Sequence, residues 1–96
     1  MSNLFQNLTT QSVTLYYSPT CGYCYRVLNA IEAMNLKIAT ENIRFNNEAR
    51  VELYKGGGKT QVPALRIKDA EGKIHWMYES LDIIEFLETQ FTSPTA

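Results

Sequence analysis

Short apolar runs alternate with amphipathic stretches along this chain, and the pattern predicts seven elements of secondary structure. Residues 13–17 combine β-branched and aromatic side chains, which is typical of a buried strand. Residues 22–35 carry apolar side chains at helical spacing, with Val27 and Ile31 on one face. Residues 38–43 form a weaker strand candidate because the middle of this segment is polar.

Two further helices are predicted from capping residues and apolar spacing. Asn46 or Asn47 can cap the first of them, and the glycines at 56–58 should stop it, since glycine disfavours a helix interior and supplies the left-handed cap. Ser80 should cap the second. We expect the apolar face of that last helix to consist of Leu81, Ile84 and Leu87, widened by Ile83 and Phe86.

Residues 63–67 and 73–78 read as two more strands, and the polar segment 68–72 between them predicts an antiparallel hairpin. The order of elements is then β-α-β-α-β-β-α. The first β-α-β should give a parallel pair with a right-handed crossover. We therefore predict an α/β fold with one four-stranded mixed sheet and helices on both of its faces.

Length and composition indicate one globular domain over residues 1–96, of which 45% are hydrophobic and 20% charged. Residues 1–11 are expected to be a loose leader and 92–96 a tail. The net charge of −1 gives no electrostatic reason to bind nucleic acid or an anionic membrane. Neither a signal peptide nor a membrane span is evident. We expect a monomer in the cytoplasm.

Cys21 and Cys24 stand three residues apart between a predicted strand and a predicted helix, which is the context of a redox CxxC. Cys21 precedes the helix, where free N–H groups and the helix dipole favour the thiolate, the nucleophilic form. Cys24 lies one turn further in on the same side and should be more buried. Thiol–disulfide exchange would then use Cys21 as attacking thiol and Cys24 as resolving thiol.

Two alternatives for the cysteine pair stay open from the residues alone. The pair could be half of a zinc site, but four ligands are usual and His75 is the only other soft ligand in the chain, so we expect no metal. The pair could also be two inert cysteines in the core. The loop of Pro19 and Thr20 before the pair and the small Gly22 within it favour a redox role.

Four positions elsewhere could contact a ligand. A cis bond before Pro63 would turn the Val62 backbone toward an extended peptide, although a trans proline is common at a strand start. Free N–H groups at Ser80 could bind a carboxylate, or Ser80 could simply be a cap. Lys59 is either a solvated loop charge or an anion ligand, and Tyr23 could flank a ligand.

Together, the segments at 17–24, 58–63 and 78–80 resemble the glutaredoxin family of the thioredoxin superfamily, and the resemblance spans about residues 12–90. It implies a thioredoxin fold with sheet order 2-1-3-4, glutathione as co-substrate, and a cis bond before Pro63. The resemblance also implies how glutathione is bound. Val62 would pair with its cysteinyl part, and Tyr23 would pack along the peptide. Lys59 would receive the glycine carboxylate with Gln61 nearby, and Ser80 would hold the γ-glutamyl carboxylate.

The chain departs from the glutaredoxin pattern in three ways. Gly22 stands where the dithiol members have proline, whereas the single-cysteine members have that glycine but a serine in place of Cys24. Gln61 replaces the common threonine. The pair Glu79 and Ser80 looks more like the glutathione-binding half of glutathione transferases, so Glu79 could contact the γ-glutamyl end.

The sequence therefore predicts an enzyme, a glutathione-dependent thiol–disulfide oxidoreductase with catalytic Cys21 and Cys24. It would act on glutathionylated or disulfide-containing proteins and on small disulfides, in electron transport and cell redox homeostasis. One alternative, suggested by Gly22, is a [2Fe–2S] cluster held between two chains by Cys21 and glutathione. Another is a glutathione-binding transferase-type module; many transferases use a hydroxyl where Cys21 stands and continue into a helical second domain, and both points disfavour it.

Overall fold

The computed structural model describes residues 8–91, so residues 1–7 of the predicted leader and the predicted tail at 92–96 lie outside the described residues. Residues 8–11 of the leader are described. In chain order, the short 3-10 helix, the strands and the α-helices are η1 (Thr10–Ser12), β1 (Val13–Tyr17), α1 (Gly22–Ala33), β2 (Ala39–Asn42), α2 (Asn47–Gly57), β3 (Ala64–Lys68), β4 (Ile74–Met77) and α3 (Ser80–Phe91).

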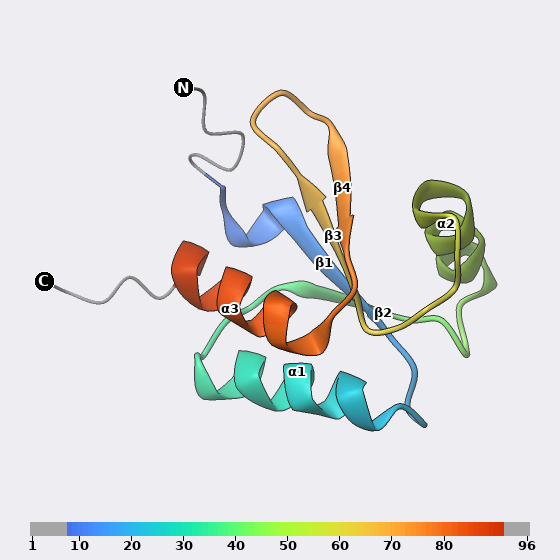
Figure 1. Cartoon of the computed structure of the whole chain (residues 1–96), viewed down its shortest axis with the longest axis horizontal. Coiled ribbons are helices and arrows are strands. Elements are labelled where there is room, and N and C mark those ends of the chain that lie inside the picture. Colours follow the sequence, from blue (N-terminus) through green and yellow to red (C-terminus); the bar gives the residue numbers. More distant parts are fainter. Residues whose placement is uncertain (1–7, 92–96) are drawn as a thin grey trace, which may run out of the picture.

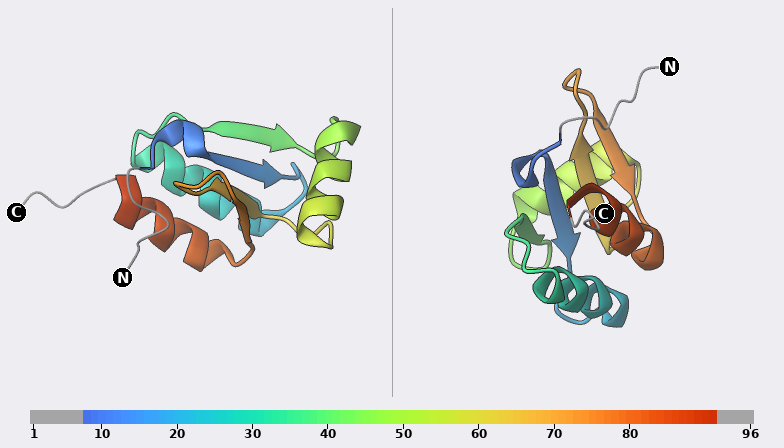
Figure 2. Two further views of the ribbon diagram at one scale, coloured as in Figure 1. Left: turned by 90° about the horizontal axis from the view of Figure 1, so that it is seen from above. Right: turned by 90° about the vertical axis from the view of Figure 1, so that its left-hand side faces the viewer.

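The four strands form one mixed sheet in the order β2-β1-β3-β4, which confirms the predicted order. β1 pairs with β2 in parallel, while β1 with β3 and β3 with β4 are antiparallel. Helices α1 and α3 lie side by side on one face of the sheet, and α2 lies apart from them on the other (Figures 1 and 2). The expected arrangement with helices on both faces is therefore also confirmed.

The larger core lies between the sheet and the pair α1 and α3. Successive residues of a strand point to opposite faces, so alternate side chains of β1 and β3 enter this core. Leu81, predicted to be part of the apolar face of α3, is 65% exposed instead. The buried face of α3 runs through Ile83 and Leu87, one turn apart, and Leu81 lies on nearly the opposite side of the helix. The buried members of this core are Val13, Leu15, Val27, Ile31, Leu65, Ile67, Ile83 and Leu87.

A second, smaller core joins α2 to the other face of the sheet. Tyr16 of β1 is buried there, and its ring meets that of Trp76 edge to face, with centroids 5.1 Å apart. The Tyr16 hydroxyl donates a hydrogen bond of 2.6 Å to Glu52 Oε1 on α2. Leu53 of α2, which is fully buried, completes the contact. This core positions the end of α2 and the loop that follows it.

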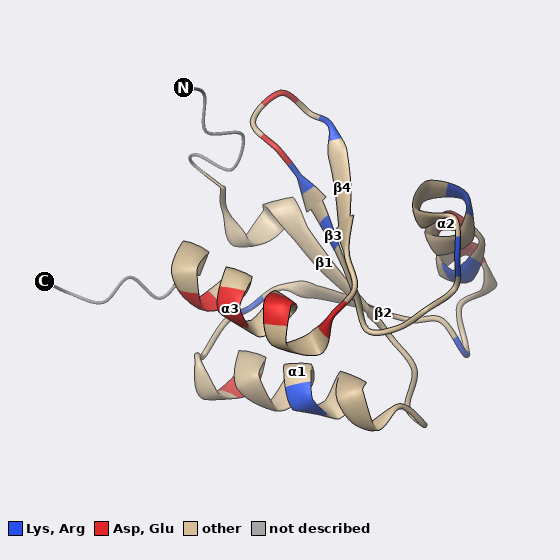
Figure 3. Ribbon diagram, viewed as in Figure 1, with Lys and Arg blue, Asp and Glu red and all other residues tan. Residues whose placement is uncertain are grey.

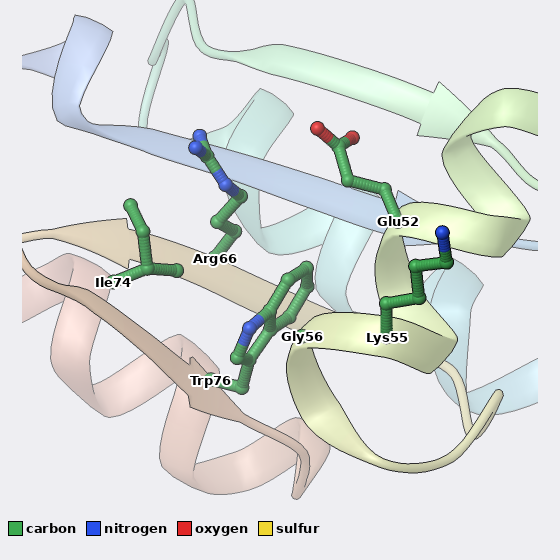
Figure 4. A pocket seen from close by; sticks show the side chains of 6 residues that line it. All are labelled: Glu52, Lys55, Gly56, Arg66, Ile74 and Trp76. Carbon is green, nitrogen blue, oxygen red and sulfur yellow. The ribbon is translucent and has the colours of Figure 1, made fainter.

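The three glycines at the end of α2 have separate roles. The helix continues through Gly56 and Gly57 and ends before Gly58, which adopts the left-handed conformation with φ 81°. A Cβ on Gly56 would lie 2.7 Å from Trp76 Nε1, and one on Gly57 would overlap the Tyr78 hydroxyl. Figure 4 shows the Trp76 indole beside the turn of α2 that contains Gly56. The prediction that the three glycines stop the helix is thus right for Gly58. Gly56 and Gly57 instead leave the space that the side chains of Trp76 and Tyr78 occupy.

The hairpin between β3 and β4 is organised by one buried carboxylate. Asp69 Oδ1 accepts hydrogen bonds from the backbone N–H groups of Glu71 (2.8 Å) and Lys73 (2.9 Å). Asp69 Oδ2 lies 2.7 Å from Nε2 of His75. The hydrogen bond to His75 is the main cause that holds the pKa of Asp69 below its usual value, and the two backbone N–H groups add to it against the opposing effect of burial.

We expect the hairpin to lose stability in acid. Because the pKa of Asp69 is lower in the folded chain, its ionised form stabilises the fold above the unfolded value of about 4, and this contribution disappears as the pH falls through the lower folded value. Asp69→Asn should therefore lower the free energy of unfolding at pH 7 and reduce its further loss between pH 7 and pH 3. Urea unfolding at both pH values measures this.

The matched control for that experiment is Asp82→Asn, which removes the same charge from an exposed position in the first turn of α3. It should keep the wild-type dependence on pH. If Asp69→Asn loses as much stability in acid as the wild type does, the carboxylate does not act as described.

Candidate active site

The N-terminus of α1 presents the Cys21 sulfur. After β1 the chain turns through residues 18–20, and Cys21 becomes the N-cap residue of α1 with an extended backbone. Its side chain is partly exposed. The backbone N–H of Cys24 donates to Cys21 Sγ at 3.2 Å, so the first turn of the helix directs a donor at the sulfur. A donor and a helix dipole in this position stabilise negative charge on sulfur.

Cys24 has the opposite environment from Cys21. It is fully buried on the inner side of α1, whereas Cys21 faces outward. Burial raises the pKa of the Cys24 thiol to about 12, and its hydrogen bond with Cys21 acts in the same direction. Both cysteines are present as free thiols. Cys24 is therefore protonated near neutral pH and inaccessible in this conformation.

The segment before β3 reaches the same sulfur. The Val62–Pro63 peptide bond is cis, as the resemblance implied. Cys21 Sγ lies 3.7 Å from the Val62 carbonyl oxygen. The two segments meet because β1 and β3 pair antiparallel, with Tyr16 opposite Ala64, so the end of β1 and the start of β3 share one edge of the sheet.

A groove of about 300 Å³ lies next to this edge. It contains six of the nine predicted site residues, and Cys21 adjoins it through its contact with Val62. Cys24 is buried, and neither it nor Lys59 is part of the lining. The lining consists of Tyr23, Gln61, Val62, Pro63, Tyr78, Glu79 and Ser80.

Ser80 differs in one respect from its prediction as a cap. It is the first residue of α3, and the carbonyl of Glu79 accepts the hydrogen bond from the Ile83 N–H at 2.8 Å, so Glu79 occupies the capping position. Ser80 is buried at 7% exposure, while Glu79 is exposed. The groove therefore ends at the positive end of α3, beside a carboxylate (Figure 3 shows the acidic residues along α3).

Tyr78 is the groove residue that sequence reasoning missed. It lines the groove, and the Lys59 ammonium lies 4.3 Å from the centroid of its ring. Burial raises the pKa of Tyr78, and its buried hydroxyl has no hydrogen-bond partner among residues 8–91. Its position directly before Glu79 and Ser80, on the same face as Trp76, was the available signal.

The structure gives no support for a metal site or a membrane-spanning helix among residues 8–91. Within residues 8–91, no group of three or more His, Cys, Asp or Glu side chains is arranged to hold a metal ion. The iron–sulfur alternative, which needs glutathione and a second chain, stays a prediction. In the same part of the chain, no helix has the length and apolar character needed to cross a membrane.

Fold and site together define a thioredoxin-like domain. Residues 20–90 match the family model described as the glutathione S-transferase N-terminal domain. The chain belongs to this family. The resemblance to glutaredoxins is thus confirmed at the level of the thioredoxin-like superfamily, while the matching family is that of the transferases, which the pair Glu79 and Ser80 had suggested.

Solved structures with the same fold include a glutathione transferase, an isomerase and a thioredoxin-like protein. Glutathione transferase Omega 3C from Trametes versicolor is 29% identical over 90% of this chain, with a TM-score of 0.69. Maleylacetoacetate isomerase from Anaeromyxobacter dehalogenans, with dicarboxyethyl glutathione in its active site, is 22% identical over 97% of this chain, with a TM-score of 0.64. A thioredoxin-like protein is 18% identical over 84% of this chain, with a TM-score of 0.66.

These neighbours differ in how much of their own length is matched. The chain covers 36% of the transferase and 39% of the isomerase, but 95% of the thioredoxin-like protein. No curated protein matches the sequence.

The two cysteines should differ sharply in reactivity with an alkylating agent. At pH 7.5 iodoacetamide should modify Cys21, whereas Cys24, buried and with a pKa of about 12, should react only after unfolding. Cys21→Ser should abolish rapid labelling, and Cys24→Ser should preserve it. Peptide mapping by mass spectrometry measures both. Equal labelling of the two cysteines in the folded chain would contradict the assignment.

Proposed function

We propose that the domain is a glutathione-dependent thiol–disulfide oxidoreductase whose reacting atom is the sulfur of Cys21. The observation that carries the proposal is the position of this sulfur. It is partly exposed, receives an N–H from the first turn of α1, and adjoins the groove that contains the cis Val62–Pro63 bond and the start of α3. Membership in the glutathione S-transferase N-terminal family supports glutathione as the ligand of this groove.

The reaction proceeds in two exchanges. The Cys21 thiolate attacks the glutathione sulfur of a glutathionylated protein, forms a mixed disulfide with glutathione, and releases the protein thiolate, which takes up a proton. A second glutathione thiolate then attacks the glutathione sulfur of that mixed disulfide. Oxidised glutathione leaves, and Cys21 returns as thiolate. Small disulfides react in the same way.

Glutathione has chemical groups that match the groove along its length. We place its cysteinyl part against the Val62 backbone, so that its sulfur is next to Cys21. The γ-glutamyl carboxylate is bound at the N–H and hydroxyl of Ser80, where the helix dipole favours negative charge. The γ-glutamyl ammonium then lies near Glu79. Tyr23 and Gln61 are also part of the groove lining.

The burial of Cys24 favours a monothiol route. A resolving thiol must approach the mixed disulfide as a thiolate, but Cys24 is fully buried and its pKa is about 12. Cys24 is therefore required only for protein dithiol substrates or for an intramolecular disulfide, after the first turn of α1 has moved. We place the reaction in the cytoplasm, where thiols are kept reduced, and on a monomer.

A second candidate function is conjugation of glutathione to an electrophile. It is favoured by the family match and by transferase neighbours such as the Trametes versicolor enzyme. The same groove would bind glutathione, but Cys21 would then stabilise the glutathione thiolate instead of forming a disulfide with it. A conjugation assay with an aromatic halide separates the two: activity there without any disulfide reduction would favour the transferase.

The roles of the two cysteines predict different losses of activity. Cys21→Ser should abolish deglutathionylation because a hydroxyl cannot form the mixed disulfide. Cys24→Ser should retain much of the activity because glutathione resolves that intermediate. The assay follows glutathione-dependent reduction of a glutathionylated peptide, with oxidised glutathione recycled by a coupled reductase. Equal loss in the two variants would contradict the proposed roles.

A further inference from the structure

We infer that Tyr78 is a positioning residue, which holds the Lys59 ammonium at the edge of the groove, where the glycine carboxylate of glutathione binds. The inference rests on the proposed function, because it concerns the same groove and the same ligand. It also accounts for Lys59, which the resemblance implies as a glutathione contact but which is not part of the groove lining.

The contact geometry places Tyr78 between the groove and the lysine. Tyr78 is part of the groove lining, and the Lys59 Nζ atom lies 4.3 Å from its ring centroid, a distance typical of a cation–π contact. Lys59 is otherwise exposed on the loop after Gly58, and Gln61, two residues further on, lines the groove. The ring therefore keeps the Lys59 cation next to the part of the groove that Tyr78 lines.

Packing with α2 fixes the ring in this position. A Cβ on Gly57 would overlap the Tyr78 hydroxyl, so the aromatic side chain can take this position only because residue 57 is glycine. The hydroxyl is buried and has no hydrogen-bond partner in the described part of the chain. Since the hydroxyl makes no bond there, the aromatic ring is the part of Tyr78 that matters for Lys59, and phenylalanine should replace it.

Fixing the ammonium has a consequence for ligand binding. A lysine side chain that is already held close to the groove loses less conformational freedom when it binds a carboxylate. Loss of the ring should therefore weaken binding of a ligand that carries the glycine carboxylate and should leave a ligand without that charge nearly unaffected. A purely structural role of Tyr78 would weaken both ligands equally.

The test compares glutathione with glutathione amidated at its glycine carboxylate, by titration calorimetry on the reduced protein. The wild type should bind glutathione more tightly than the amide. Tyr78→Leu should weaken glutathione binding about two- to fivefold, with little change for the amide. Tyr78→Phe should keep the wild-type preference. Tyr54→Leu, a matched change at an exposed tyrosine of α2, should alter neither affinity.

Three results would overturn the inference. Equal weakening of both ligands by Tyr78→Leu would make Tyr78 a structural wall of the groove. A wild type that binds both ligands equally would show that Lys59 does not receive the carboxylate, while the proposed function would stand. A wild type that binds neither ligand would overturn the proposed function as well.

The wild type provides an independent measurement if Tyr78→Leu does not fold. The Lys59 ε-methylene protons should show an upfield ring-current shift in the proton spectrum, and this shift should persist in the complex with glutathione. Tyr78→Phe should keep it. Absence of the shift in the wild type would overturn the inference without reference to any destabilised variant.

Discussion

The antiparallel register of β1 with β3 is the constraint on which the site depends. Tyr16 pairs with Ala64, so the loop that leaves β1 and the loop that enters β3 are brought to one edge of the sheet. One loop ends at Cys21 and the other contains Val62, and their atoms approach to 3.7 Å. The register itself is held by the side chains of both strands, which are buried between helices on opposite faces. A shift by one residue would exchange these faces and separate the sulfur from the groove.

The same helix start gives two identical side chains opposite properties. Cys21, at the cap, is partly exposed and receives a backbone N–H, whereas Cys24, three residues later, points into the core and has a pKa of about 12. The difference arises mainly from position on the helix, since burial is the main cause of the raised pKa of Cys24 and the neighbouring Cys21 only adds to it. A cap residue precedes the helix, and a residue in its first turn can already face the sheet. The division between attacking and resolving thiol that we propose would then follow from the fold.

Apolar spacing predicted the strands, because they depend on local patterns, whereas the order of the sheet and most of the groove residues were implied by the resemblance to glutaredoxins. Sequence patterns failed where a tertiary contact decides the outcome. Leu81 is apolar but lies away from the buried face of α3, which runs through Ile83 and Leu87 where the helix packs against the sheet. Gly56 and Gly57 looked like helix breakers, but they are required by aromatic side chains twenty residues later in the chain. The contact between Lys59 and Tyr78 could not be predicted for the same reason.

The identity of the atom at the N-cap of α1 decides which chemistry this groove can perform. A hydroxyl there could donate a hydrogen bond to the glutathione thiolate and leave it free to attack an electrophile. A thiolate there would repel that anion, but it can form a covalent bond to the glutathione sulfur and release it again. The Cys21 sulfur has a backbone N–H at 3.2 Å and an open groove beside it, which leaves room for such a bond. Under the proposed function, cysteine at this position exchanges disulfides, and activation of glutathione for conjugation stays the second candidate.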